Sequence, residues 1–145
     1  LLQEILITNS RQLEEELREA VSRKGDIPTT LYRVARAYFD FAENHRKFYM
    51  FMLSQFYAGR ETEGFRAVYP LIRKYYQLVV QIFADASQEL GNMGGRQEQF
   101  AISFIGILDS HMMLAFRDLS EEKSVTISDE QTYEIVRQFL YGIYS

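Results

Sequence analysis

The residues of this chain that could carry out chemistry are few, and their spacing does not suit a reaction centre. There are two histidines, His45 and His111, and no cysteine, so thiol catalysis and cysteine-ligated metals are excluded within this chain. His111 follows Asp109 by two residues. Residues two apart on a helix do not face the same point, so we do not expect this pair to bind a metal ion.

Catalytic motifs are also missing from these 145 residues. The sequence has no HExxH motif, no pair of Glu-x-x-His motifs for two metal ions, no nucleophile elbow and no phosphate-binding loop. The glycine-containing stretch 91–95 joins two predicted helices and lacks a lysine, serine or threonine anchor, so we interpret it as a turn. We therefore predict a protein that is not an enzyme, with no catalytic residue, no metal site and no cofactor.

Size and charge limit the remaining classes of protein. A chain of 145 residues suits one domain, spanning 1–145, with a core of its own. A net charge of −4 argues against direct binding to a phosphate backbone. The chain has no run of about 20 apolar residues that would span a membrane, and its first residues do not resemble a signal peptide. We expect a cytoplasmic protein with no membrane contact.

Apolar residues recur at steps of three and four along six segments, which predicts an all-α domain, a single bundle of about six helices. Asp26 and Ser128 are in positions to cap helices, and Gln131 completes a capping box with Ser128. Pro70 interrupts one segment, so either that helix kinks there or it begins there. The six segments are 1–24, 26–44, 46–56, 65–90, 97–119 and the residues that follow Ser128.

The segment 97–119 is apolar on two opposite sides. At 100° per residue, one side carries a line of mostly small residues and the other a bulkier line that includes Phe104, Leu108 and His111. A helix of this kind must be covered on both sides. We predict that the bulky side faces the core and that the small side packs against the same helix of a second molecule.

The last helix is a second candidate for an intermolecular surface. With the helix at 97–119 it is predicted to form a four-helix bundle between the two chains of a homodimer. The predicted interface residues are Ser103, Gly106, Ser110, Met113, Arg117, Val136, Phe139, Leu140 and Ile143.

Three stretches carry a resemblance to a known family: LLQEIL at 1–6, RVARAYFDFAENHRKFYMFML at 33–53 and FIGILDSHMM at 104–113. In this order they resemble the C-terminal effector-binding and dimerisation domain of TetR-like bacterial transcriptional regulators. The resemblance covers essentially the whole chain. It implies a homodimeric regulator that binds a small hydrophobic or aromatic effector. Contact with operator DNA would be made only through an N-terminal helix-turn-helix head, which is absent from this sequence.

Aromatic residues on the inward stripes of four helices are the predicted effector pocket. For each of them, packing in the core is an alternative role. The predicted ligand-binding residues are Tyr38, Phe41, Phe51, Tyr75, Tyr76, Phe104, Leu108 and His111. His111 would orient a ligand by a hydrogen bond or would be a satisfied core histidine, and Asp109 is interpreted as a structural carboxylate.

A different class of protein is also compatible with the pattern. In a non-enzymatic helical adaptor, the two-sided helix would bind another protein and the aromatic residues would only fill the core. A void-free interior with no response to ligands would favour the adaptor.

Overall fold

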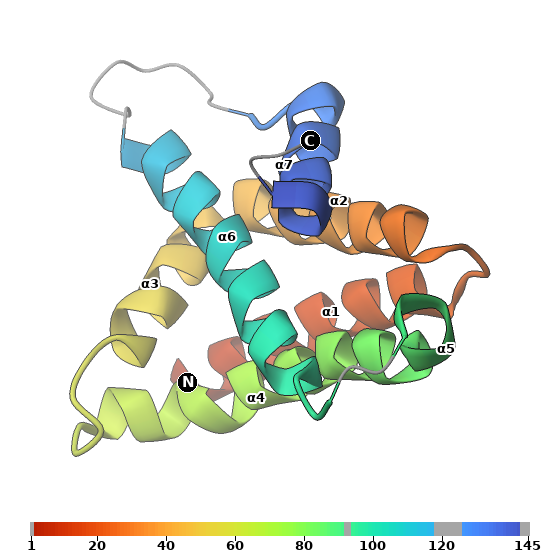
Figure 1. Ribbon diagram of the computed structural model, residues 1–145. Helices are drawn as coiled ribbons and strands as arrows, with labels where there is room; N and C mark the ends of the chain where they lie inside the picture. Colours follow the sequence, from red (N-terminus) through yellow and green to blue (C-terminus); the bar gives the residue numbers. More distant parts are fainter. Residues whose placement is uncertain (1, 92–93, 118–125, 143–145) are drawn as a thin grey trace.

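The computed structural model describes residues 2–91, 94–117 and 126–142, and this part of the chain contains seven helices and no strand. The prediction of an all-α fold is confirmed, since the described residues form helices and no strand. Six of these helices are long, in agreement with the predicted number of about six, and α5 is a single turn (Figure 1). The helices are α1 (Leu2–Ser22), α2 (Ile27–Asn44), α3 (Arg46–Phe56), α4 (Glu63–Asp85), α5 (Ser87–Leu90), α6 (Gln97–Arg117) and α7 (Asp129–Tyr141).

Local signals fix the ends of several helices as the sequence predicts. The Asp26 carboxylate accepts a hydrogen bond from the Thr29 amide at 2.9 Å and caps α2. Ser128 and Gln131 form both halves of the capping box that begins α7. These caps satisfy amide groups that have no partner inside the helix, which is why short polar side chains mark helix starts so reliably.

The start of α4 differs from the prediction. A threonine, Thr62, caps this helix by accepting a hydrogen bond from the Phe65 amide at 3.1 Å, and the helix begins at Glu63. It runs without a break through Pro70 and ends at Asp85. A start at Pro70 is therefore wrong, because the capping residue lies eight residues upstream. A single helix to residue 90 is also wrong, because α5 is a separate helix.

The helices pack around one core. α4 lies against both α1 and α6, α2 lies against α1, α6 and α7, and α3 joins α2 to α4 on one side of the molecule (Figure 1). The core is rich in large rings, since three tyrosines and three phenylalanines are among the largest fully buried side chains. These six residues are Tyr38, Tyr49, Tyr75, Phe39, Phe41 and Phe104.

One side of α6 is covered by the protomer and the opposite side is open. The buried side consists of Ala101, Phe104, Ile105, Leu108, Asp109, Met112 and Phe116. On the open side Ile102 is 52% exposed and Leu114 is 60% exposed, and a Cβ atom added to Gly106 would meet nothing within 4 Å. The small residues predicted to meet a partner therefore lie on the side that the protomer leaves uncovered.

The core-facing side of α6 is rotated from its predicted position. His111 is exposed, about a quarter of a turn from the centre of the buried side, so its expected place in the core is wrong. Asp109 and Met112 lie inside instead. By length and composition α6 would also suit a membrane span, and its buried side accounts for part of that apolar character.

The predicted interface residues of α7 pack largely within the protomer. Val136 is buried, and the Phe139 ring lies 5.1 Å from Phe104 and 6.1 Å from Phe83, measured between ring centroids. Leu140 is partly buried against the same core. Where the sequence predicts a partner for these side chains, the structure shows α2 and the core, and Ile143 lies outside the described residues.

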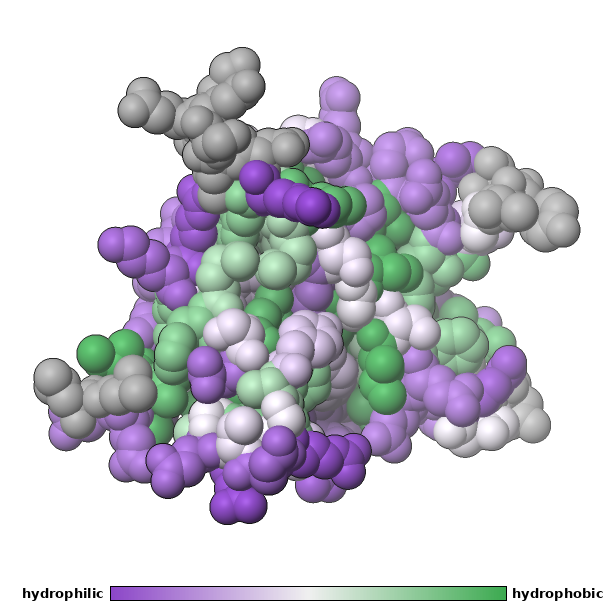
Figure 2. All heavy atoms as spheres, turned by 90° about the vertical axis from the view of Figure 1, so that its left-hand side faces the viewer, coloured by the Kyte–Doolittle hydropathy of each residue, from purple (hydrophilic) through white to green (hydrophobic). Residues whose placement is uncertain are grey.

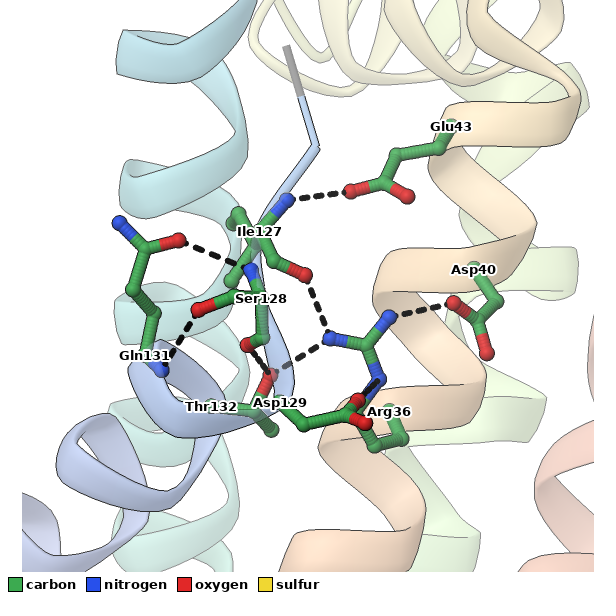
Figure 3. A network of polar contacts seen from close by, with 8 residues as sticks. All are labelled: Arg36, Asp40, Glu43, Ile127, Ser128, Asp129, Gln131 and Thr132. Carbon is green, nitrogen blue, oxygen red and sulfur yellow. Dashed lines mark hydrogen bonds and ion pairs between the residues drawn. The ribbon is translucent and has the colours of Figure 1, made fainter.

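A polar network ties the start of α7 to α2 (Figure 3). Its centre is Arg36, whose side chain is 17% exposed. The guanidinium donates to the Ile127 carbonyl oxygen at 2.6 Å and to the Thr132 hydroxyl at 2.7 Å. Because this cation reaches from the middle of α2 to the capping region of α7, it fixes the position of the last helix.

Carboxylates complete the network around Arg36 (Figure 3). Asp40 pairs with the guanidinium at 2.5 Å and Asp129 at 3.3 Å. Glu43 accepts a hydrogen bond from the Ile127 amide at 2.8 Å, and burial raises the pKa of that carboxyl. Both backbone groups of Ile127 are thus bound by side chains of α2.

Replacing Arg36 tests whether this network holds α7 in place. We expect Arg36→Ala to lower the free energy of unfolding by about 2 kcal/mol, because it leaves polar groups of Ile127 and Thr132 without their donor. Urea denaturation followed by circular dichroism measures the change. The matched control is Arg18→Ala, which breaks an exposed pair with Glu14 and should cost about 0.3–0.5 kcal/mol. Equal effects of the two changes would contradict a structural role for Arg36.

Candidate functional site

A buried carboxylate lies where four helices meet. The Asp109 side chain on α6 accepts hydrogen bonds at Oδ1 from the Tyr38 hydroxyl of α2 at 2.5 Å and the Tyr49 hydroxyl of α3 at 2.6 Å. The Tyr75 hydroxyl of α4 lies 3.5 Å from that of Tyr38. We call these four residues, Tyr38, Tyr49, Tyr75 and Asp109, the Asp109 cluster.

The rings of the cluster surround the carboxylate with aromatic surface. The Tyr38 ring lies 5.9 Å from the Tyr49 ring in an edge-to-face arrangement and 5.9 Å from the Tyr75 ring. Tyr76, which is half-buried, extends this group with a centroid distance of 5.4 Å to Tyr75. Such contacts stabilise the packing beyond the burial of apolar area, so the tyrosines are both walls and hydrogen-bond donors.

Burial controls the protonation of the cluster. It raises the pKa of Asp109 to about 6, and the hydrogen bonds from Tyr38 and Tyr49 act in the opposite direction. Burial and the nearby Asp109 charge raise the pKa values of Tyr38, Tyr49 and Tyr75, so these hydroxyls keep their protons and donate them. At neutral pH the cluster therefore consists of neutral hydroxyl donors and a carboxylate that is mostly ionised.

The second carboxylate oxygen of Asp109 has no partner in the cluster. Both hydrogen bonds end on Oδ1, and Oδ2 accepts none from the described residues. All fully enclosed side-chain nitrogen and oxygen atoms of the described residues do have a hydrogen-bond partner, so Oδ2 is not one of these enclosed atoms. Oδ2 therefore keeps contact with accessible space, although the residue as a whole is only 5% exposed. Among the described residues no lysine, arginine or histidine forms an ion pair with Asp109.

The structure divides the predicted ligand-binding residues into separate groups. Tyr38 and Tyr75 join the Asp109 cluster, whereas Phe41 packs against His45 and Phe48. Phe104 packs against Phe139 near α7. Leu108 is also buried, Phe51 and Tyr76 are half-buried, and His111 is exposed. Only part of the predicted set therefore surrounds a common point.

Tyr49 and Asp109 are the residues of this cluster that the predicted ligand-binding set omits. The sequence interpretation of Asp109 as a structural carboxylate agrees with its two hydrogen bonds. A signal for Tyr49 does exist, because a carboxylate in an apolar helix needs buried donors, and Tyr49 lies on the inward stripe of α3 with Met52 and Leu53.

Two surface grooves flank α6. A groove between α4 and α6 has a volume of about 260 Å³ and is lined by Phe56, Tyr69, Ile72, Arg73, Tyr76, Gln77, Val80, Glu98 and Ile102. The groove between α6 and α7, of about 570 Å³, contains His111. Tyr76 connects the first groove to the cluster through its contact with Tyr75. Figure 2 shows one face of the molecule, with apolar and weakly polar residues in the middle and hydrophilic residues around them.

The described residues contain no group of three or more histidine and acidic side chains that could hold a metal ion. Comparison with known proteins adds no relative, since no protein-family model, no curated protein and no solved structure matches the chain.

The raised pKa of Asp109 predicts a specific pH dependence of stability. The folded protein binds this proton more tightly than the unfolded chain, in which the Asp109 carboxyl has its ordinary pKa of 3.8. The stability that protonated Asp109 contributes is therefore fully present below pH 3.8 and is lost as the pH rises through about 6. A difference of this size corresponds to about 3 kcal/mol.

Urea denaturation at several pH values between 4 and 7 measures this effect. Relative to Asp109→Asn, the wild type should lose about 2 kcal/mol of unfolding free energy over this range, because part of the effect lies below pH 4. Asp85→Asn, at an exposed position of α4, is the matched control and should follow the wild type. Parallel profiles for the wild type and Asp109→Asn would show that the carboxylate titrates as it does in the unfolded chain.

Proposed function

We propose that this chain is the regulatory domain of a TetR-like transcriptional regulator. It forms a homodimer through the open side of α6 and binds a small hydrophobic or aromatic effector beside the Asp109 cluster. The all-α fold and the resemblance of three sequence stretches support this proposal. In this proposal the domain is cytoplasmic, catalyses no reaction and needs no cofactor.

The observation that carries the proposal is the two-sided character of α6. Asp109 on its buried side contacts α2 and α3, while Ile102 and Leu114 are exposed on the other side. An effector that moves Asp109 therefore also moves the surface offered to a second chain. Coupling requires that the effector bind one arrangement better than the other, typically by about 1–3 kcal/mol.

The packing offers a route from the effector to DNA. α4 contacts α6 along one side and α1 along another, so a displacement of α6 reaches α1 through one intermediate helix (Figure 1). In a TetR-like regulator, the DNA-binding head would precede α1. Because operator half-sites are separated by about 34–36 Å, a small change in the tilt of α1 would alter the fit of two heads to DNA. The sequence encoded upstream of Leu1 tests this part directly, since it should contain a basic three-helix head.

A non-enzymatic helical adaptor is the second candidate. The packing of the core favours it, because the large rings on the inward stripes are mostly buried against one another. A core filled in this way needs no ligand to be stable. The two functions differ in their response to small molecules, while both use the open side of α6.

A substitution at Gly106 tests the dimer. A Cβ at this position meets nothing within 4 Å in the protomer, so Gly106→Arg should leave the fold intact. A long charged side chain there should separate two α6 helices that pack closely, and sedimentation equilibrium should show a dimer for the wild type and a monomer for the variant. The matched control is Ala67→Arg at an exposed position of α4, which should remain dimeric. A monomeric wild type at high concentration would refute the dimer.

Thermal unfolding with 3-tert-butylbenzyl alcohol, a neutral aromatic compound, tests effector binding. A ligand that binds only the folded state at 100 times its Kd stabilises the protein by about 2.7 kcal/mol, so the midpoint should rise with ligand concentration. The gain should be smaller for Tyr75→Ala than for Tyr133→Ala, because Tyr133 is exposed on α7 and serves as the control. A dimer that responds to no aromatic compound would support the adaptor instead.

A further inference from the structure

The charge of Asp109 is unbalanced inside the protein. Asp109 as a residue is 5% exposed, and its carboxylate accepts two hydrogen bonds from neutral hydroxyls. No cationic side chain of the described residues pairs with it. Arg46 is separated from the cluster by a ring, since its guanidinium lies 4.6 Å from the centre of Phe116, which contacts Tyr49. Buried charges in proteins are ordinarily paired, so this carboxylate lacks the partner that such a group usually has.

The free oxygen and the rings together define what that partner would be. Oδ2 of Asp109 accepts no hydrogen bond and still contacts accessible space. The rings of Tyr38, Tyr49 and Tyr75 lie around the same carboxylate. Aromatic faces attract cations through their quadrupole, and a carboxylate attracts them through its charge, so both features favour the same kind of ligand.

We propose that the effector is a small organic cation, whose ammonium group binds at Oδ2 of Asp109 among the tyrosine rings. This inference rests on the proposed function, because it names the chemistry of the effector. An anion is excluded by the charge of the site. A neutral hydrophobic compound makes no use of the carboxylate.

The groove between α4 and α6 gives such a cation its path to the cluster. Tyr76 lines this groove and contacts Tyr75, and the Asp109 charge adds to burial in raising the pKa of Tyr76. The electrostatic field of the carboxylate is therefore felt at the wall of the groove. Tyr76 is half-buried and Tyr75 is buried, so the Tyr76 ring lies between the groove and the cluster.

Charges in the groove itself do not select the ligand. The lining contains one cationic and one acidic side chain, Arg73 and Glu98, and both are exposed. Their opposite charges offset one another and are weakened by solvent. Selection for a cation therefore depends on Asp109, where water is largely absent and electrostatic interactions are stronger.

The groove also limits the size of the ligand. Its volume of about 260 Å³ is slightly below the usual range for ligand sites, about 300–1,000 Å³. A compound with one aromatic ring and one trimethylammonium group is of this size.

A matched pair of ligands separates charge from shape. The neutral member is 3-tert-butylbenzyl alcohol, and the cationic member replaces the quaternary carbon of its tert-butyl group with nitrogen. Isothermal titration calorimetry at pH 7 should show that the wild-type protein binds the cation at least about tenfold more tightly. Asp109→Asn should abolish this preference, while Glu98→Gln, an acidic residue of the same groove, should retain it.

The pH dependence provides a test that needs no variant and serves if Asp109→Asn fails to fold. The tyrosines that face Asp109 come from α2, α3 and α4, and their raised pKa values keep them neutral at pH 5–7. Tyr57, which follows α3, also has a raised pKa. Lowering the pH from 7 to 5 should therefore weaken binding of the cation by about tenfold, because Asp109 gains a proton, and should leave binding of the neutral isostere unchanged.

Three results would overturn the inference. If the neutral isostere binds as tightly as the cation, the effector is selected by shape and the proposed sensor remains. If Glu98→Gln loses the preference and Asp109→Asn keeps it, the cation binds in the outer groove. If neither compound binds at millimolar concentration, this class of ligand is excluded, and a monomeric wild type in sedimentation would then refute the proposed regulator as well.

Discussion

The hydrogen bonds from two tyrosine hydroxyls to the Asp109 carboxylate are the constraint on which the arrangement of the helices depends. A carboxylate without donors in this position would be costly to bury, so Tyr38 of α2 and Tyr49 of α3 must both reach it. This requirement sets the rotation of α6 about its own axis. Once Asp109 faces inward, Ser103 and Ser110 face outward, and the open side of the helix is defined.

The same constraint explains why an apolar helix carries two different surfaces. Burial of Phe104 and Leu108 supplies much of the apolar packing of α6, and the carboxylate supplies its orientation. The Arg36 network has a corresponding role for α7, since one partly buried cation binds the Ile127 carbonyl oxygen and the Thr132 hydroxyl. In both places, hydrogen bonds to a charged group decide how a helix is placed on a core whose apolar contacts alone would allow several positions.

The helices themselves were predictable from sequence because their signals are local. Asp26 and Ser128 mark helix starts through side chains that bond to amides three residues away. Which side of a helix is buried was harder to predict for α6, where apolar residues occur all round and periodicity does not choose between them. His111 and Asp109 differ by two positions, and only the tyrosines of other helices determine which one lies inside. Tyr49 was missed for the same reason, since its hydroxyl finds its partner 60 residues away.

The choice of a carboxylate at position 109 supports a role beyond packing. The two hydroxyls need only an acceptor, which the oxygen of an amide would also provide without a charge. An apolar residue in a repacked core would often be at least as stable as a buried charged group. Asp109 instead brings a charge into the core, and burial raises its pKa to about 6, which is a measure of the free energy that this charge costs. The described residues offer no cation to offset this cost. A ligand that supplies the missing positive charge would offset it on binding, and the folded domain would be stabilised most by the molecules that it is built to detect.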